Sequence, residues 1–407
     1  MSRSMSSPRW LSIVGLGEDG RAGLSSAARA ALEGAELVVG GARHLALAAP
    51  LAVETLAWPS PLTAAYDAIL ARRGRPVCVL ATGDPFHYGV GAELARLVRA
   101  EEIAAYPAPS AFSLAAARMG WPVAECALLT LHGRALERVV PALQPGARLL
   151  VLAWDGATAQ KLAALLAERG FGASRITVLE AMGGPRERRR SAAAEAFDLA
   201  GIDPLNTLAV AVEAGPGARP IPLAPGLDDA WFESDGQLTK AEVRAITLAA
   251  LRPRPGALLW DLGAGAGSVA IEWCLRHPAC RAVAVEQDPA RAKRIARNAR
   301  ALGVPDLAVV TGRAPDALAG LAPPDAVFVG GGVSADGLLP AAWAALPPGG
   351  RLVTNAVTLE SEAALIAARA RLGGRLTRIA IARAEPVGGM TGWRPAMPVT
   401  QWAATKP

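Results

Sequence analysis

The chain has 407 residues, a 52% hydrophobic composition and a formal net charge of +6. This length favours two domains over a single core, and the composition excludes a disordered or fibrous protein. The sequence contains no apolar run of about 18 residues, the length needed to cross a bilayer, so we expect no membrane span. The arginines are spread along the chain without a basic tail. We therefore expect no nucleic-acid partner, although the positive charge would attract a small polyanion.

The chain begins with MSRSMSSPRW, which contains two arginines, and continues with a short apolar stretch that ends in glycines. This pattern predicts a strand and a turn rather than a secretory signal, so we expect a cytoplasmic protein. The four cysteines form no C-x-x-C pair, and the four histidines are scattered singly. Because a zinc site needs clustered ligands, we expect no metal.

The first half of the chain alternates short apolar runs with Ala/Leu/Arg-rich stretches of helical spacing, such as 21–34 and 89–101. The apolar runs predict strands at 11–17, 36–40, 76–82, 147–154, 175–180 and 207–213. Alternating strands and helices predict an α/β fold with a largely parallel sheet. Three turns from strand to helix carry glycine or proline, namely those at 15–17, 82–85 and 107–110. Taken singly, each is an ordinary turn.

A stretch rich in glycine and proline, from Gly215 to Asp229, interrupts any helix or central strand. We therefore predict one domain at 1–215, a linker at 216–230 and a second domain at 231–407. The second domain begins with an amphipathic helix at 238–251, for which Thr239 is a possible N-cap. Strands are predicted at 257–263, 282–286, 307–312, 325–331 and 350–357, and the tail from 376 could add antiparallel strands.

The clearest local signal is LLWDLGAGAGSVAIEW at 258–273, in which an apolar strand leads to Asp261 and then to glycines 263, 265 and 267. Glycine lets the backbone turn tightly and lets a ligand approach, and the following helix offers its N-terminal N–H groups. Glu286, at the end of the next strand, can accept hydrogen bonds from both ribose hydroxyls of a nucleoside. A dinucleotide fingerprint would place its third glycine at position 268, which is Ser268. An NAD-dependent oxidoreductase is therefore the weaker alternative.

Several motifs resemble known methyltransferases. The N-terminal half resembles the tetrapyrrole (class III) methyltransferases in its turns at Gly15 to Gly17, Gly83 to Pro85 and Pro109 to Ala111. The C-terminal half resembles class I methyltransferases of cobalamin synthesis in DGQLTKAEVRA (235–245), the glycine loop and NAVTLE (355–360). The fused order resembles the precorrin-6Y C5,15-methyltransferases (decarboxylating) over nearly the whole chain. VVGGARHL (38–45), GDPFHYGVG (83–91) and LHGR (131–134) are also typical of that family.

The resemblance implies a bilobal tetrapyrrole-methyltransferase domain followed by a Rossmann-like class I methyltransferase domain, with S-adenosyl-L-methionine bound by both. It implies methylation of precorrin-6Y at carbons 5 and 15, with loss of carbon dioxide from the carbon-12 acetate to give precorrin-8. The N-terminal type of domain is associated with carbon 5, and the C-terminal type with carbon 15 and decarboxylation. No catalytic acid or base is identified, and a homo-oligomer is expected.

The residues that the resemblance implies fall into two sets. The cofactor set is Gly15, Gly17, Thr82, Gly83, Asp84 and Ser110 in the first domain, and Thr239, Asp261, Gly263, Gly265, Gly267, Glu286, Gly330 and Gly331 in the second. The set for the polycarboxylate tetrapyrrole substrate is His87, Arg134, Lys240, Arg313 and Asn355, with Arg186, Arg188, Arg244 and Arg394 as further carboxylate anchors. For each arginine, the alternative to binding substrate is that it is a solvated surface residue. For Glu272, on the helix after the glycine loop, the sequence allows a side chain that faces either a pocket or solvent.

Two further alternatives stay open at this point. The first is the same reaction on the cobalt-containing, oxygen-independent branch of the pathway, which the sequence separates poorly. The second is that one half is a catalytically silent scaffold, although glycine motifs in both halves oppose this.

Overall fold

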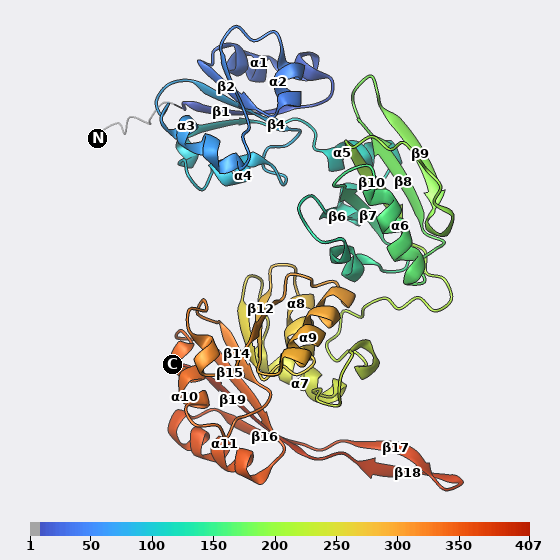
Figure 1. Cartoon of the computed structure of the whole chain (residues 1–407), viewed down its shortest axis with the longest axis vertical. Coiled ribbons are helices and arrows are strands. Elements are labelled where there is room, and N and C mark those ends of the chain that lie inside the picture. The colour runs from blue at the N-terminus through green and yellow to red at the C-terminus, as the bar shows by residue number, and fades with distance from the viewer. Residues whose placement is uncertain (1–8) are drawn as a thin grey trace. The chain divides into compact units, whose positions relative to one another are not determined.

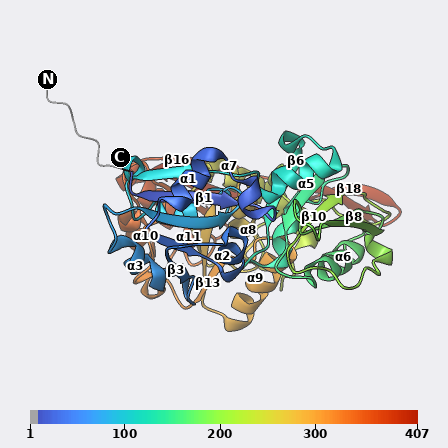
Figure 2. The ribbon, with the colours of Figure 1, turned by 90° about the horizontal axis from the view of Figure 1, so that it is seen from above.

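The structure is a computed structural model that describes residues 9–407. Residues 1–8, which include most of the stretch considered above for a secretory signal, lie outside the described residues. Two compact units divide the chain (Figures 1 and 2): residues up to Leu136 with Ala142–Arg219, and Glu137–Pro141 with Pro220–Pro407. The division after Arg219 falls inside the interval 216–230. Among the described residues, no helix is long and apolar enough to cross a membrane.

The first lobe of the N-terminal unit is a five-stranded sheet in the order β3-β2-β4-β1-β5, and all of its pairs are parallel. Its strands are β1 (Leu11–Leu16), β2 (Leu37–Gly40), β3 (Glu54–Ala57), β4 (Val77–Thr82) and β5 (Ile103–Tyr106). Side chains alternate between the faces along each strand. One face packs against α1 (Ser26–Glu33) and α2 (Ala42–Ala48), and the other against α3 (Tyr66–Leu70) and α4 (Val90–Leu94).

The second lobe of this unit is a mixed five-stranded sheet in the order β6-β7-β10-β8-β9. Its strands are β6 (Cys126–Thr130), β7 (Arg148–Leu152), β8 (Arg175–Glu180), β9 (Arg188–Ala193) and β10 (Asn206–Ala211). Helix α5 (Ala111–Met119) packs on one face, and α6 (Thr158–Glu168) contacts β8. The largely parallel sheet predicted for this half is confirmed in the first lobe and wrong in the second, because β10 runs antiparallel between β7 and β8.

The C-terminal unit is a three-layer α/β sandwich around a seven-stranded sheet in the order β13-β12-β11-β14-β15-β19-β16. The first five strands in this order pair in parallel. Strands β19 and β16 pair antiparallel, as the sequence predicted for the tail. The strands are β11 (Leu258–Leu262), β12 (Arg281–Glu286), β13 (Ala308–Thr311), β14 (Ala326–Val329), β15 (Arg351–Ala356), β16 (Arg375–Ile379) and β19 (Val399–Thr405). These observations confirm the predicted fold class.

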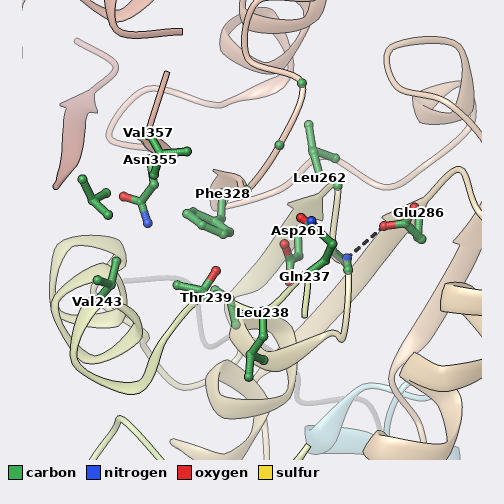
Figure 3. A pocket seen from close by; sticks show the side chains of 18 of the residues that line it. Gln237, Leu238, Thr239, Val243, Asp261, Leu262, Glu286, Phe328, Asn355 and Val357 are labelled. Carbon is green, nitrogen blue, oxygen red and sulfur yellow. Dashed lines mark hydrogen bonds between the residues drawn. The ribbon is translucent and has the colours of Figure 1, made fainter. Parts of the chain in front are cut away.

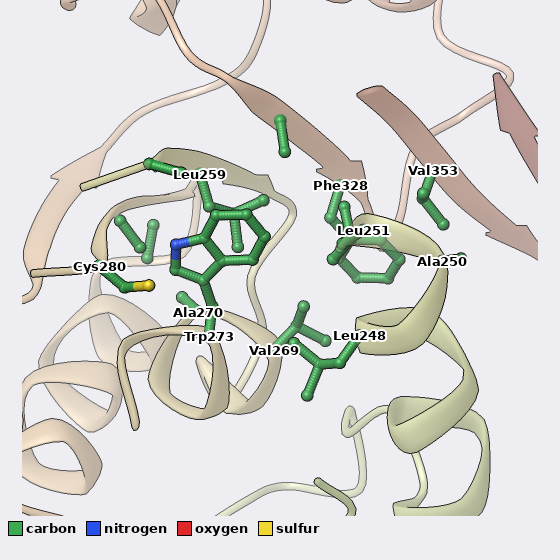
Figure 4. Packing of buried hydrophobic residues seen from close by; sticks show 14 of the residues in the cluster. Leu248, Ala250, Leu251, Leu259, Val269, Ala270, Trp273, Cys280, Phe328 and Val353 are labelled. Atoms are coloured by element: carbon green, nitrogen blue, oxygen red, sulfur yellow. The ribbon is translucent and has the colours of Figure 1, made fainter. Parts of the chain in front are cut away.

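Helices cover both faces of this sheet. Helices α7 (Ala241–Leu251), α8 (Ser268–Leu275) and α9 (Pro289–Ala301) pack on one face, and α10 (Leu338–Ala345) and α11 (Leu359–Leu372) on the other. Figure 4 shows the first interface, where Trp273 of α8 and Leu251 of α7 pack near Phe328 of β14. Strands β17 (Ala382–Val387) and β18 (Met390–Pro395) form a hairpin that extends as a long arm from the unit (Figure 1).

Some predicted helix limits were wrong for local reasons. The helix expected at 21–34 begins only at Ser26, because Ser25 caps it after a short 3-10 turn at Gly20–Gly23. The stretch 89–101 forms the five-residue α4 and then the start of a 3-10 turn at Ala100–Glu102, after which the chain enters β5. Short strands such as β3, β5 and β6 were not predicted, since four or five residues give too little periodicity.

Candidate functional site

The glycine loop of the C-terminal unit joins β11 to α8. Gly263, Gly265 and Gly267 have φ values of +70°, +59° and +76°, which side chains rarely tolerate, so the loop requires glycine at these positions. A Cβ on Gly263 would also lie 3.2 Å from the backbone nitrogen of Gly331, in the turn after β14. The ends of β11 and β14 are thus brought together at the carboxyl edge of the sheet, where parallel α/β folds bind ligands.

Asp261 is a buried carboxylate with an unsatisfied oxygen. Its side chain is 1% exposed, and Oδ2 accepts a hydrogen bond from the backbone N–H of Ala270 at 3.0 Å. Oδ1 has no hydrogen-bond partner among the described residues. Burial raises the pKa of Asp261 to about 7; the Ala270 N–H opposes this shift and the nearby Glu286 adds to it. A buried acceptor without a donor indicates that a ligand donor completes this site.

Glu286 ends β12 on the other side of the glycine loop. Its Oε2 accepts from the backbone N–H of Gly265 at 2.9 Å (Figure 3). Its Oε1 accepts from the backbone N–H of Asp288 at 3.0 Å. These bonds hold the carboxylate in one orientation and leave lone pairs on both oxygens. Glu286 can therefore still accept hydrogen bonds from a ligand's hydroxyl groups.

A cavity of about 660 Å³ contains both carboxylates. It brings together most of the residues predicted for this half, namely Thr239, Lys240, Asp261, Gly263, Gly265, Glu286, Arg313, Gly330, Gly331 and Asn355. Gly267 is not among the residues that line it. A Cβ there would lie 2.7 Å from Cγ2 of Ile295 on α9, so this glycine allows α8 and α9 to pack closely. The prediction that Gly267 contacts the cofactor stays a prediction, and the structure shows a packing role for this glycine.

The wall of the cavity away from the glycine loop is apolar. Val243, Ile379 and Val399 form a small buried cluster there, with Ile381 packed against it. In Figure 3, Asn355 and Glu286 lie on opposite sides of the view, with Phe328 between them. The cavity therefore has a polar end and an apolar end.

Four cationic side chains also line this cavity. Three of them pair with carboxylates: Lys240 with Asp229, Arg291 with Asp235, and Arg383 with Glu242. The guanidinium of Arg313 has no protein partner within residues 9–407, and this side chain is exposed. Arg313 is thus available for an anionic ligand.

Thr239 does not cap α7, contrary to the prediction. The helix begins at Ala241 after Lys240, whose side chain makes no capping hydrogen bond. Thr239 instead lines the cavity, and its carbonyl accepts a hydrogen bond from the Arg244 guanidinium.

Arg244 and Glu272 form an ion pair in which both side chains are 0% exposed. Glu272 also accepts from the backbone N–H groups of Gly226 and Leu227, and Arg244 donates to the Leu227 carbonyl. Two predictions are corrected here: Glu272 faces neither the pocket nor solvent, and Arg244 is not an anchor for substrate. The pair instead ties the segment before α7 to the core of the unit.

In the N-terminal unit, the turns after β1, β4 and β5 meet at the carboxyl edge of the first sheet. A Cβ on Gly15 would lie 1.8 Å from the Gly83 carbonyl oxygen and 2.6 Å from the Ala108 nitrogen. Gly83, with φ +58°, donates its N–H to Leu16, and its carbonyl accepts from Ala108 at 3.1 Å. Gly15 and Gly83 are therefore required for contact between these turns, whatever they bind.

Most polar side chains at this edge have partners in the protein, with one buried nitrogen of His44 as the exception. Thr82 Oγ1 lies 2.9 Å from Nη2 of Arg43 and 2.8 Å from Nε2 of His44. Arg43 also pairs with Glu18, which directly follows Gly17. His44 Nδ1 is buried without a partner among the described residues, and burial followed by the neighbouring Arg43 lowers the pKa of His44 to about 4.

Asp84 and Ser110 hold the shape of the turns in which they lie. Oδ1 of Asp84 accepts from the N–H of Phe86 at 2.9 Å, and Oγ of Ser110 accepts from that of Ser113 at 3.1 Å as the N-cap of α5. The predicted start of a helix at Ser110 is confirmed.

His87 and Arg134, both predicted to contact substrate, lie at one aromatic cluster. The ring of His87 stacks on Tyr88 and packs against Phe112, with centroids 5.4 and 4.7 Å apart. Arg134 lies over Tyr88 at 5.8 Å. The other arginines considered are paired: Arg186 with Asp203, Arg188 with Glu180, and Arg394 with Glu385.

Sequence reasoning missed several residues of the C-terminal cavity. Gln237 and Leu238 line it beside Thr239, and their motif at 235–245 was a signal that could have identified them. Arg383 lies at the start of β17 and Met397 follows β18, and neither residue is part of a motif that the sequence analysis identified. Within residues 9–407, no group of three or more His, Cys, Asp or Glu is placed to hold a metal ion.

Comparison with known proteins bears on both halves. Residues 11–198 match the model of the tetrapyrrole (corrin/porphyrin) methylases, and residues 230–406 match that of the precorrin methyltransferase domain. A precorrin-6Y C(5,15)-methyltransferase [decarboxylating] from Sinorhizobium is 56% identical over 398 residues, which are 98% of this chain and 96% of that protein. The chain belongs to the precorrin-6Y C5,15-methyltransferase family. This membership confirms the resemblance and identifies the chain as a methyltransferase.

Other relatives cover all of the chain or only half of it. A protein of the same name from Mycobacterium tuberculosis is 44% identical over 97% of this chain and 99% of its own length. A probable cobalt-precorrin-6B C(15)-methyltransferase (decarboxylating) from Pyrobaculum calidifontis is 39% identical over 44% of this chain and 96% of its own length. The solved C-terminal domain of a precorrin-6Y C5,15-methyltransferase from Rhodobacter capsulatus is 48% identical, with a TM-score of 0.44 over 46% of this chain and 100% of that domain.

Membership of a methyltransferase family implies that S-adenosylmethionine is the methyl donor. The residues of the C-terminal cavity fit this molecule. The unsatisfied Oδ1 of Asp261 suits a cationic amino group, and the oriented Glu286 suits a ribose. The glycines between them leave room for the ligand backbone.

Proposed function

We propose that this chain methylates precorrin-6Y at carbons 5 and 15, using S-adenosylmethionine at two sites, and removes the carbon-12 acetate carboxylate as carbon dioxide to give precorrin-8. The observation that carries this proposal is the C-terminal cavity, in which the unsatisfied Asp261 carboxylate lies at one end and an apolar wall at the other. A reduced tetrapyrrole combines an apolar ring with carboxylates, so it matches an apolar wall near cationic side chains.

At the polar end, bound S-adenosylmethionine would supply an electrophilic methyl group. Asp261 would accept hydrogen bonds from its amino group, and Glu286 from its ribose hydroxyls. The protein then mainly aligns the donor with the ring carbon and excludes water, which accounts for large rate gains without a nucleophilic side chain.

At the polar end, where Thr311 of β13 pairs with Glu286 of β12, Arg313 would bind a substrate carboxylate directly, since its guanidinium has no protein partner within the described chain. Lys240 and Arg383 could bind others by exchanging their surface carboxylates for those of the substrate. Arginine suits this role because its planar guanidinium binds carboxylates in a bidentate manner.

We assign the carbon-5 methylation to the N-terminal unit. Support comes from the three turns that meet at its sheet edge and from the aromatic cluster of His87, Tyr88 and Phe112, which offers ring surfaces for a macrocycle. Arg134 beside this cluster is the candidate carboxylate anchor.

Titration of S-adenosylhomocysteine into the full chain, with NAD as control, tests the number of sites. We expect two equivalents to bind and NAD to give no response. Mass spectrometry of the product from precorrin-6Y should show two added methyl groups and the loss of one carbon dioxide. Binding of a single equivalent would contradict the second site, and a response to NAD would contradict the methyltransferase mechanism. Faster turnover of the cobalt-containing substrate would move the assignment to the oxygen-independent branch.

A homo-oligomer and a cytoplasmic location stay predictions. The hairpin arm supports the first, because Val387, Met390 and Trp393 are 57%, 79% and 77% exposed on it. Sedimentation of the full chain should give a multiple of the 41.8 kDa chain mass, whereas a monomer at micromolar concentration would contradict this expectation.

A further inference from the structure

The apolar end of the C-terminal cavity contains a polar network that the proposed function has not used. Asn355 of β15 lines the cavity, and two buried residues lie behind it: Thr247 of α7 and Gln401 of β19, which are 0% and 2% exposed. Asn355 and Gln401 are direct partners in the antiparallel pairing of β15 with β19. Residues about 50 to 150 positions apart in sequence thus meet at one point.

The hydrogen bonds of this network fix the orientation of the Asn355 amide. Thr247 Oγ1 donates its only proton to the Val243 carbonyl at 2.8 Å, so it can only accept from the two amides. It accepts from Nδ2 of Asn355 at 3.0 Å and from Nε2 of Gln401 at 3.2 Å. Gln401 Nε2 also donates to Oδ1 of Asn355 at 3.0 Å. Both protons of the Gln401 amide are therefore used.

One N–H of Asn355 has no protein acceptor in the described part of the chain. Its nitrogen faces Thr247 and its oxygen faces Gln401, so the amide cannot turn over without losing both bonds. Burying the polar groups of Thr247 and Gln401 behind Asn355 costs free energy of desolvation, whereas apolar groups of the same shape would be nearly neutral or stabilising. The network is therefore better explained by the need to present a neutral donor in a fixed direction.

We propose that Asn355 donates this hydrogen bond to the acetate carboxylate that leaves as carbon dioxide, and that Thr247 and Gln401 are its positioning residues. This inference rests on the proposed decarboxylation. When carbon dioxide is lost, the bond between the acetate methylene and the carboxylate carbon breaks, and its electron pair passes into the conjugated ring. The carboxylate charge becomes the second C=O bond, and the methylene carbon takes a proton from solvent to become a methyl group.

A neutral donor suits this step better than a cation would. A guanidinium would bind the charged carboxylate more strongly than the transition state, in which that charge is leaving, and would thereby raise the barrier. In Figure 3, Val243, Phe328 and Val357 lie on the same side of the view as Asn355, and apolar side chains of this kind weaken the hydration of a carboxylate. Arg313, Lys240 and Arg383 instead suit the carboxylates that are retained.

The test compares Thr247→Val with Thr247→Ser in the full chain. Valine preserves the shape but removes the acceptor, whereas serine keeps it. With precorrin-6Y, we expect Thr247→Val to lower kcat for carbon dioxide release by roughly 10- to 100-fold, with little change in KM or in the affinity for S-adenosylhomocysteine. Thr247→Ser should recover most of the rate. Methylation by the N-terminal unit should continue, so that methylated but undecarboxylated product accumulates.

Gln401→Glu gives an independent measurement. A glutamate carboxylate cannot donate to Oδ1 of Asn355, so the amide should turn and present its oxygen, and carbon dioxide release should fall at least as far as in Thr247→Val. An unchanged rate in Thr247→Val, or the same loss in Thr247→Ser, would overturn the inference. So would an equal loss of affinity for S-adenosylhomocysteine, since that result would indicate a structural role only. If the wild-type chain releases no carbon dioxide from precorrin-6Y, the proposed function itself fails, and this inference fails with it.

Discussion

The two glycine-containing edges of this chain look alike in sequence but differ in how their polar groups are satisfied. In the N-terminal unit, Gly15 and Gly83 bring turns into backbone contact, and Thr82 has two side-chain partners. In the C-terminal unit, Asp261 has a buried oxygen without a partner on the wall of a cavity. His44 Nδ1 at the N-terminal edge is also buried without a partner, so an unsatisfied atom alone does not separate the two edges. A glycine motif thus identifies a tight turn, whereas an unsatisfied buried acceptor on the wall of a cavity points to the position of a ligand.

Each unit contains an arginine that pairs with a glutamate near its glycine-containing edge. The largest expected change in unfolding free energy comes from replacing these two arginines. Arg244 pairs with Glu272 in full burial, whereas Arg43 and Glu18 are 35% and 11% exposed. Arg244→Met should cost about 3–5 kcal/mol of unfolding free energy, because it leaves Glu272 buried without its charge partner. Arg43→Met should cost only about 1 kcal/mol, since water partly solvates that pair. Denaturant unfolding of the two variants measures the difference, and equal losses would contradict the comparison.

The next effect is a pH dependence confined to the C-terminal unit. The pKa of Asp261 is raised to about 7 in the folded protein, so its contribution to stability is present at pH below about 4 and is lost as the pH rises through 7. In Asp261→Asn the side chain cannot ionise, so this loss of stability at higher pH is absent. By pH 8 the variant should therefore be more stable than the unchanged protein by up to about 4 kcal/mol, and at pH 4 the two should be similar. Thermal unfolding of both proteins between pH 4 and 8 measures how their difference in stability grows with pH. A difference that does not change with pH would contradict this prediction.

A smaller effect is expected at the N-terminal edge from Gly15→Ala. The new Cβ would overlap the backbone of Gly83 and Ala108, which cannot move as a flexible side chain could. We expect a loss of about 1–3 kcal/mol in the N-terminal unit, measured by denaturant unfolding. A neutral result would show that the three turns are not held in contact.

The smallest stability effect is expected at Gly331, which serves as the matched control. A Cβ there would meet no heavy atom within 4 Å, so Gly331→Ala should change the unfolding free energy by less than about 0.5 kcal/mol. Because the methyl group would project at the cavity wall, calorimetry should show weaker binding of S-adenosylhomocysteine at one site. Unchanged binding at both sites would remove Gly331 from the cofactor set.

The fold class and the strand-end residues could be predicted because they depend on local patterns. Apolar runs located the central strands, and the glycines marked turns where φ is positive. The antiparallel course of β10 could not be predicted, since it depends on which strands it pairs with. The burial of Arg244 with Glu272 and the network behind Asn355 were also missed. Both join residues that are distant in sequence, and a single charged or amide residue carries no signal of its partner.

The most direct test of the difference between the two edges is the affinity for S-adenosylhomocysteine between pH 5 and 7.5, measured by titration of the full chain and of Asp261→Asn. The cationic amino group of the ligand should require ionised Asp261. One of two sites should therefore weaken by about tenfold for each pH unit below 7, while the other stays constant. In Asp261→Asn this dependence should disappear and one site should be weak at every pH. Dependence at both sites or at neither, or its persistence in Asp261→Asn, would contradict the account.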